Sequence, residues 1–131
     1  MDPVRFTGAR TARSGRLLKG KKGEDRAVRY LKRKGYRILD RNYRFKHWEI
    51  DIIAQKGDTI VFVEVKRRKN EEFAPVEEAI TPDKIKRVVR ASQAYLLSKG
   101  LYNRRKIRYD VILMVDERKE IIHYEGVWRN T

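Results

Sequence analysis

The stretch from Trp48 to Lys66 constrains this chain most strongly, because it predicts a β-hairpin with charged residues inside its strands. The segments Trp48–Gln55 and Thr59–Val65 are rich in Ile, Val and Phe, which favour strands. Between them, Lys56-Gly57-Asp58 has the composition of a tight turn. Any fold for this chain must therefore accommodate two paired strands that carry acids and bases.

Four charged residues of the hairpin are expected to share one face of the sheet. Side chains two apart in a strand point the same way. Glu49 and Asp51 form one such pair in the first strand, and Glu64 and Lys66 form the other in the second. The opposite face is expected to carry four apolar residues, namely Ile50, Ile52, Val63 and Val65.

The turn determines how closely the acids of the two strands approach each other. Two-residue loops are the commonest hairpin connection, and one at Lys56-Gly57 is the arrangement we expect. It would place Asp51 diagonal to Glu64, roughly 7–8 Å away between Cα atoms. A four-residue loop would instead place the two acids directly opposite each other, and a three-residue loop would separate them.

Facing acids destabilise a half-buried sheet unless something compensates their charge. A divalent cation is a natural compensation, because Mg²⁺ binds one or two carboxylates together with waters and phosphate oxygens. Lys66 beside the acids could hold a phosphate or position an attacking water. The spacing alone leaves a second interpretation equally open, in which the face is exposed and carries ordinary surface ion pairs.

The charge balance predicts a polyanionic partner. The 131 residues include 33 Lys and Arg against 18 Asp and Glu, a net charge of +15, which favours DNA or RNA over a membrane surface or no partner at all. Cysteine is absent, so disulfides, zinc–thiolate sites and thiol nucleophiles are excluded. No apolar run approaches the ~20 residues of a membrane helix, and residues 1–22 lack the apolar block of a signal peptide. We therefore expect a cytoplasmic protein without a membrane partner.

Two helices are predicted around the hairpin. Residues 1–22 are expected to form a mobile basic arm, followed by a single domain over residues 23–131. Gly23–Lys34 has a helical period that could begin as early as Arg16, and Glu24 lies on or beside its inward stripe. An acid in the first turn of a helix also suits the helix dipole, which explains Glu24 without a functional role. Thr81-Pro82-Asp83 predicts the start of the second helix.

The remaining strands complete an α/β fold. Tyr36–Arg44 is expected to precede the hairpin, and Ile107–Val115 and Ile121–Trp128 to follow the second helix. Val111–Val115 is continuously apolar, as in a strand covered on both faces. The order predicts an α/β sandwich with a mixed central sheet, in which the second helix permits a parallel crossover.

Basic residues near the acids are candidate phosphate contacts, with a solvated surface as the alternative. Arg67, Arg68 and Lys69 are expected in a loop that leaves the hairpin, and Lys84 and Arg87 are expected on the second helix. Trp48 could stack on a base if it is exposed. His47 fits an ordinary strand-edge residue better than a general base.

Several stretches together resemble a known family. They are Gly23-Glu24, Asn42-Tyr43-Arg44, Glu49–Ala54, Phe62–Lys66, Glu78-Ala79-Ile80, Lys84 and Arg108–Val111. In this order they are similar to the YraN-like family, which itself resembles archaeal Holliday junction resolvases and the wider PD-(D/E)XK, restriction-endonuclease-like superfamily. The resemblance implies a restriction-endonuclease-like sandwich with an α-β-β-β-α-β core.

The resemblance also implies roles for single residues. Asp51 and Glu64 would be metal ligands, assisted by the backbone carbonyl of Val65. Lys66 would steady the attacking water or the charge on the phosphate, and Glu24 would be the first-helix acid of resolvase-like members. Mg²⁺ is the implied cofactor, and Mn²⁺ could replace it.

Two functions from different classes follow. The first is a metal-dependent endonuclease that cuts DNA phosphodiester bonds and, if resolvase-like, acts on branched DNA as a homodimer. The second is a non-catalytic protein that binds nucleic acid with the same fold, in which case binding should depend on salt but not on metal. RNA fits the charge argument as well as DNA does, so an RNA-associated factor is a third, weaker reading.

Overall fold

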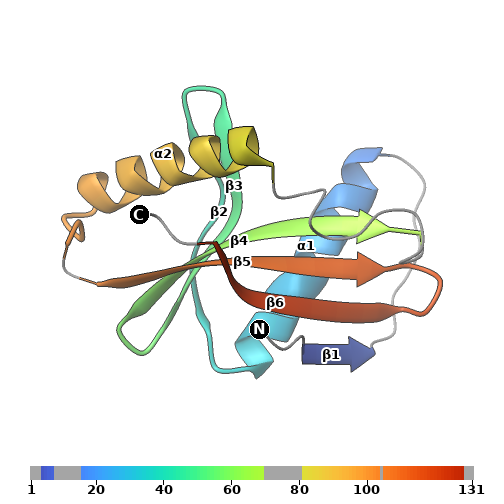
Figure 1. Cartoon of the computed structure of the whole chain (residues 1–131). Coiled ribbons are helices and arrows are strands. Elements are labelled where there is room, and N and C mark those ends of the chain that lie inside the picture. Colours follow the sequence, from blue (N-terminus) through green and yellow to red (C-terminus); the bar gives the residue numbers. More distant parts are fainter. Residues whose placement is uncertain (1–3, 8–15, 70–80, 104, 129–131) are drawn as a thin grey trace.

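Within the described residues, a six-stranded mixed sheet lies between two helices (Figure 1). The computed structural model describes residues 4–7, 16–69, 81–103 and 105–128, and at 4–7, 16–22 and 128 it describes the backbone alone. The helices are α1 (Arg16–Arg33) and α2 (Pro82–Ser98). The strands are β1 (Val4–Thr7), β2 (Arg37–Phe45), β3 (Trp48–Lys56), β4 (Thr59–Arg68), β5 (Lys106–Val115) and β6 (Glu120–Trp128).

The observed order of elements confirms the predicted α-β-β-β-α-β core. Helix α1 begins at Arg16, which is the earlier of the two starts considered. The predicted basic arm, residues 1–22, contains β1 and the first turns of α1, and its other residues lie outside the described part of the chain. One local prediction was wrong: Arg67 and Arg68, expected in a loop, are the last residues of β4.

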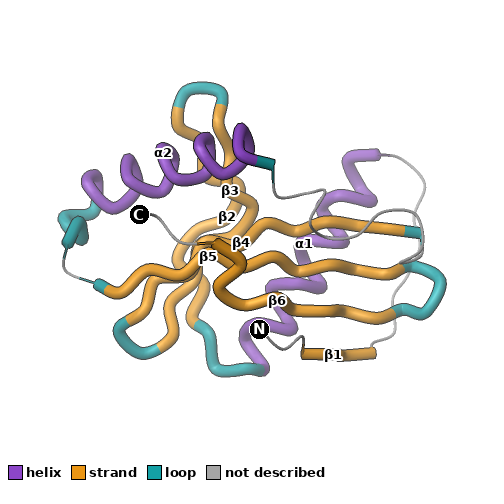
Figure 2. The backbone as a smooth tube through the Cα atoms, in the orientation of Figure 1, coloured by secondary structure: helices purple, strands orange, loops and turns teal. Residues whose placement is uncertain are grey.

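The strand order is β1-β6-β5-β4-β3-β2, and Figure 2 shows the strands lying side by side. Strands β4 and β5 pair in parallel, while the other neighbours are antiparallel. A parallel pair needs a long connection, and α2 lies in the connection between β4 and β5. The predicted parallel crossover is therefore present. Strand β5 is buried from Tyr109 to Val115, as expected for a strand covered on both faces.

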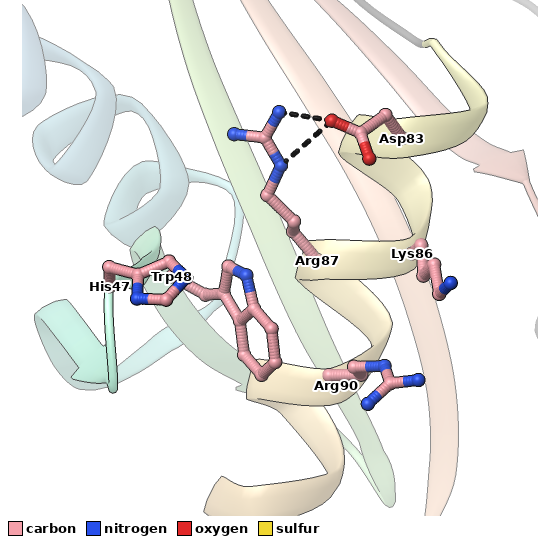
Figure 3. A pocket seen from close by; sticks show the side chains of 6 residues that line it. All are labelled: His47, Trp48, Asp83, Lys86, Arg87 and Arg90. Carbon is pink, nitrogen blue, oxygen red and sulfur yellow. Dashed lines mark hydrogen bonds and ion pairs between the residues drawn. The ribbon is translucent and has the colours of Figure 1, made fainter.

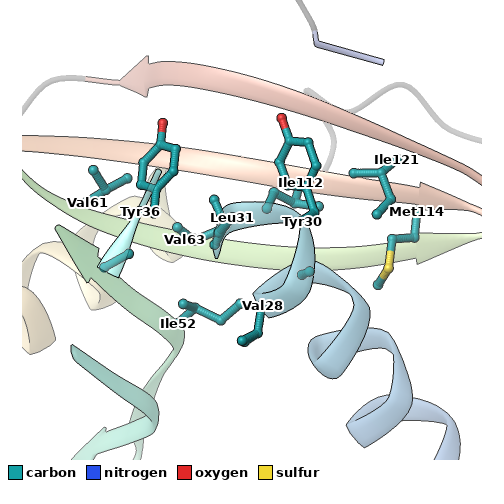
Figure 4. Close-up of a cluster of buried hydrophobic side chains, with 12 residues drawn as sticks. Val28, Tyr30, Leu31, Tyr36, Ile52, Val61, Val63, Ile112, Met114 and Ile121 are labelled. Carbon is teal, nitrogen blue, oxygen red and sulfur yellow. The ribbon is translucent and has the colours of Figure 1, made fainter. Parts of the chain in front are cut away.

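Each face of the sheet carries its own apolar core. On one face α1 contributes Ala27, Val28, Tyr30 and Leu31, which pack against strand residues that include Ile52 and Val63 (Figure 4). On the other face α2 contributes Val88, Ala91, Tyr95 and Leu96, which pack against strand residues that include Ile53 and Phe62. Successive residues of β3 and β4 thus point into different cores, which holds the centre of the hairpin rigidly between the two helices.

The hairpin turn lies one residue later than predicted. Lys56 pairs with Thr59, so the two-residue loop is Gly57-Asp58 rather than Lys56-Gly57. Gly57 has a φ of +61°, a left-handed conformation that glycine adopts without steric cost, and this fixes the position of the turn. The resulting register pairs Ile52 with Val63. Continued by one residue, it sets Asp51 across from Glu64, the arrangement expected of a four-residue loop.

Strand β3 changes direction just before the Ile52–Val63 pair. Ile50 belongs to the core under α2, whereas Ile52, two residues later, belongs to the core under α1. The prediction that Ile50 shares a face with Ile52 was therefore wrong, because the alternation of a regular strand is broken between them. Figure 1 shows β2 and β3 rising beside α2 while β4 continues along β5. We call the place where β3 and β4 separate, beyond Ile52 and Val63, the strand fork.

Candidate functional site

Two carboxylates meet at the strand fork. Glu64 is buried, with 9% of its surface exposed, and Asp51 is half-buried at the point where the backbone pairing of β3 and β4 stops. The backbone N–H of Val65 donates a hydrogen bond to Asp51 Oδ2 at 2.8 Å. The side chain of Asp51 therefore takes a bond that a backbone carbonyl would accept in a continuing sheet.

The environment of Asp51 opposes its ionisation. Burial raises the pKa of Asp51 to about 8, with further contributions from the charge of Glu64 and a hydrogen bond to it, while the Val65 N–H acts in the opposite direction. A carboxyl whose pKa lies near 8 keeps its proton at neutral pH unless a cation approaches. Perturbed acids of this kind are typical of functional sites, although structural networks also produce them.

Lys84 supplies a positive charge to the acid pair. Its Nζ lies 3.0 Å from Glu64 Oε2, and both side chains are largely shielded from solvent. The start of α2 places it there: the backbone N–H of Lys84 donates to Thr81 Oγ1 at 3.1 Å, which confirms the predicted N-cap. The structure therefore brings Lys84, predicted as a phosphate contact, into direct contact with a predicted metal ligand.

Lys66 and the backbone of Val65 border the same site. Lys66 lies two residues after Glu64 in β4, on the same face of the strand by alternation, and it forms no ion pair or hydrogen bond with any described residue. The N–H and C=O of one strand residue point to the same side. Because the Val65 N–H reaches Asp51, its carbonyl should face the fork as well.

Glu24 lies near the pair but has a different partner. Its carboxylate is 3.8 Å from Arg41, and its charge contributes to the raised pKa of Asp51. Burial raises the pKa of Glu24 itself, against the lowering effects of Asn42 and Arg41. Among the residues that the structure describes, no three acidic or histidine side chains come together closely enough to hold one metal ion. The close set is therefore two acids, with Glu24 beside it.

The predicted phosphate contacts are mostly engaged with acids. Arg67 pairs with Asp116 at 3.0 Å, and Arg87 pairs with Asp83 on its own helix. Arg68 donates to the carbonyl of Arg67. Glu49, one of the four charged residues predicted for the hairpin face, pairs with Arg44 at 3.2 Å, and both side chains are exposed. Lys69 is exposed at the end of β4.

A buried polar network on β5 and β6 was missed from the sequence. Asp110, fully buried, accepts hydrogen bonds from His123 Nε2 at 2.7 Å and from Arg108 Nε at 2.9 Å, and a third from the backbone N–H of Gly126. Burial alone would raise the pKa of Asp110, but these hydrogen bonds hold it below its ordinary value. His123 Nδ1 also contacts the Tyr30 hydroxyl at 2.9 Å, which ties α1 to the sheet. The sequence offered one signal for this network, since Asp110 and His123 are polar residues within largely apolar strands.

Similarity to known proteins covers the part of the chain that forms the strand fork. The family model of the uncharacterised protein family UPF0102 matches residues 23–114. The chain belongs to this family. The UPF0102 protein of Persephonella marina is 42% identical over 111 residues, which cover 85% of this chain and 93% of that protein. The UPF0102 protein FP2501 of Flavobacterium psychrophilum is 44% identical, with 83% and 92% covered.

Membership of UPF0102 confirms the resemblance to the YraN-like family. The match includes Glu24, both acids of the fork and both lysines beside them, since all lie within residues 23–114. A third relative, the UPF0102 protein of Syntrophus aciditrophicus, is 49% identical over 98 residues, or 73% of this chain and 75% of that protein. In the described part of this UPF0102 chain, no helix has both the length and the apolar character needed to cross a membrane.

Proposed function

We propose that this protein is a divalent-metal-dependent endonuclease that hydrolyses DNA phosphodiester bonds at the strand fork. The single observation that carries the proposal is the proximity of Asp51 and Glu64, two shielded acids of which only Glu64 has a cationic partner among the described residues. Such a pair is costly to the fold. A hard cation would offset that cost, which gives the arrangement a physical reason.

The residues present fit Mg²⁺ or Mn²⁺. Asp51 and Glu64 offer carboxylate oxygens and Val65 a carbonyl oxygen, and Mg²⁺ commonly uses one or two carboxylates and completes its shell with water and phosphate oxygens. When bound, such an ion polarises the phosphate and makes a coordinated water easier to deprotonate. Binding would also require Asp51 to lose its proton.

The lysines have distinct roles in this proposal. Lys66, which has no partner among the described residues, would stabilise the negative charge that develops on the phosphate. With Glu64 bound to the cation, Lys84 would contact a neighbouring phosphate, since its side chain is 29% exposed. In the reaction, water oxygen bonds to phosphorus, one P–O ester bond breaks, and a water proton passes to the leaving oxygen. The products are one phosphate end and one hydroxyl end.

The test is cleavage of labelled linear duplex, flapped and four-way-junction DNA with Mg²⁺ or Mn²⁺. Asp51→Asn and Lys66→Met should each reduce the rate by at least about 100-fold, because the first removes a ligand of the cation and the second removes a positive charge that stabilises the transition state. Glu49→Gln is the matched control, since it removes an acid two residues from Asp51 that is already paired with Arg44. Equal rates in the wild type and both site variants would reject the proposal.

The Lys84–Glu64 ion pair favours a second candidate, a nucleic-acid-binding protein without catalysis. Glu64 already has a cationic partner at 3.0 Å, so the site could persist without metal. Binding should then be salt-dependent, as the net charge of +15 implies, and it should survive both chelation and Asp51→Asn. Affinity that scarcely changes between low and high salt would contradict this candidate. Competition between DNA and RNA would identify the preferred polymer.

A further inference from the structure

A second site lies outside the strand fork, between the β2–β3 turn and the first turns of α2. It is a pocket of about 520 Å³, and Figure 3 shows the six side chains that line it. They are His47, Trp48, Asp83, Lys86, Arg87 and Arg90. Each wall of the pocket is close to a residue of the fork along the chain, since Trp48 precedes Asp51 by three residues and Asp83 precedes Lys84 by one.

The helix wall of the pocket is basic. Lys86, Arg87 and Arg90 lie on the exposed side of α2 at helical spacing, and the one acid among the lining residues, Asp83 on the same helix, pairs with Arg87 (Figure 3). Lys86 and Arg90 form no ion pair with any described residue. Two cations are thus available to an anionic ligand, and the third is held by an exposed and therefore weak ion pair.

The strand wall of the pocket is aromatic. The Trp48 ring is half-buried, with the Phe45 ring 5.9 Å away and tilted by 36°, and the His47 ring 5.5 Å away at a steep angle. The Arg90 guanidinium lies over the Trp48 ring, 5.8 Å from its centroid. Arg90 is exposed, so it can move aside and leave an indole face that the neighbouring rings hold in place.

We propose that this pocket binds an unpaired DNA nucleotide, whose base stacks on Trp48 and whose flanking phosphates contact Lys86, Arg87 and Arg90. Aromatic faces combined with a positive groove are the arrangement by which proteins bind single-stranded nucleic acid. Bases inside a duplex are stacked on one another and expose only their edges in the grooves, so the Trp48 ring cannot stack on a base of fully paired DNA. The inference rests on the proposed function only in taking DNA as the polymer.

The position of the pocket also predicts where a cut would fall. Asp51 follows Trp48 by three residues of β3, which span roughly 10 Å in a straight strand and less in this bent one. Successive nucleotides in a stacked strand are about 3.4 Å apart, and those in an unstacked strand are farther apart. A phosphate at the fork would therefore lie at most about three nucleotides from the base on Trp48, so cleavage should occur within about three nucleotides of the boundary between paired and unpaired DNA.

The experiment measures binding of a fluorescently labelled oligo-dT and of a blunt duplex, in EDTA, so that no cleavage is needed. Trp48→Leu should weaken oligo-dT binding about 10-fold, the loss expected for one stacked base, and leave duplex binding within about 2-fold. Trp48→Phe should retain most of the affinity, because it keeps a stacking surface. An equal loss for duplex and oligo-dT, or no loss for either, would overturn the inference.

Charge variants of exposed residues provide an independent readout. Lys86→Met and Arg90→Met should each reduce the slope of log affinity for oligo-dT against log salt by about 0.7, the value for one lost contact to a single strand. Lys32→Met is the matched control, because it removes one exposed charge from α1, on the other side of the sheet, and should leave the slope almost unchanged. Asp83→Asn should strengthen binding by up to about 5-fold, since it releases Arg87.

The outcomes separate this inference from the proposed nuclease. Absence of cleavage together with the expected losses in Trp48→Leu would reject the nuclease and keep the pocket. Cleavage that is unaffected by Trp48→Leu, with equal salt slopes in Lys86→Met and Lys32→Met, would reject the pocket and keep the nuclease.

Discussion

Replacing Asp51 with Asn should stabilise the protein near and above neutral pH when no divalent cation is present. Asp51 is shielded beside Glu64, and burial together with that neighbouring charge raises the pKa of Asp51 from 3.8 to about 8. Between these two pH values the folded protein keeps a proton that the unfolded chain releases. The unfolded state then binds fewer protons, so the free energy of unfolding falls as pH rises from about 4 to about 8.

The size of the effect follows from the pKa difference. Each pKa unit corresponds to about 1.36 kcal/mol, so the roughly three units between the ordinary value and neutral pH give an upper limit of about 4 kcal/mol. Local rearrangement and entry of water lower such penalties, and we expect about 2–4 kcal/mol. The Asn side chain keeps an oxygen that can accept the Val65 N–H, now 2.8 Å from Asp51 Oδ2, so little is lost in return.

Urea unfolding in EDTA at about pH 5, 7 and 8.5 measures this effect. The wild type should lose stability across the series, whereas Asp51→Asn should lose much less and be the more stable protein at the upper end. Glu49→Gln is the control, because Glu49 is 39% exposed and paired with Arg44, and its replacement should change stability by less than about 0.5 kcal/mol. If Asp51→Asn is less stable than the wild type at about pH 8.5, the reasoning about the acid pair is wrong.

Three further changes have clear expected outcomes. Asp110→Asn should cost about 2–4 kcal/mol by urea unfolding, because it replaces the charged acceptor of hydrogen bonds from the buried His123 and from Arg108. The wild-type contribution should be fully present above about pH 3.8 and be lost as pH falls through the lowered pKa of Asp110. Lys84→Met should lower stability by about 1–3 kcal/mol by removing the partner of Glu64, and millimolar Mg²⁺ should restore more stability in this variant than in the wild type if the fork holds a cation. Thr81→Ala should cost about 1 kcal/mol in thermal unfolding by removing the N-cap of α2.

Local chemistry predicted much of the fold. The pair Thr81-Pro82 specifies a helix start without reference to the rest of the molecule, and α2 begins where it indicates. Runs of β-branched residues located the strands, because both faces of the central strands are covered and the residues must be apolar in succession. Asp51 and Glu64 could also be selected as candidate site residues, because acids inside apolar strands destabilise a sheet unless their charge is compensated.

Contacts between distant segments could not be predicted in the same way. Lys84 and Glu64 are twenty residues apart, and only the placement of α2 over the sheet brings Nζ to 3.0 Å from Oε2. Likewise, the hydrogen bond between Asp110 and His123 joins two neighbouring strands, so the sequence around either residue gives no sign of its partner. The register of the hairpin depended on whether Gly57 takes the first or the second position of the two-residue loop, and it takes the first, with a positive φ.

At the strand fork, the break in the regular alternation of β3 also creates the candidate site. A regular β3 would point Ile50 and Ile52 into the same core and would pair its backbone with β4 throughout. Instead the two residues enter different cores, the pairing stops at Ile52, and the Asp51 carboxylate takes the N–H of Val65. Separation of the strands leaves room for Glu64 and Asp51 to lie together, while the cores on both faces prevent the strands from closing over them. The same bend carries Trp48 toward α2 and forms one wall of the basic pocket. The bend therefore links the two sites proposed here, and a substitution that straightened β3 would disrupt both.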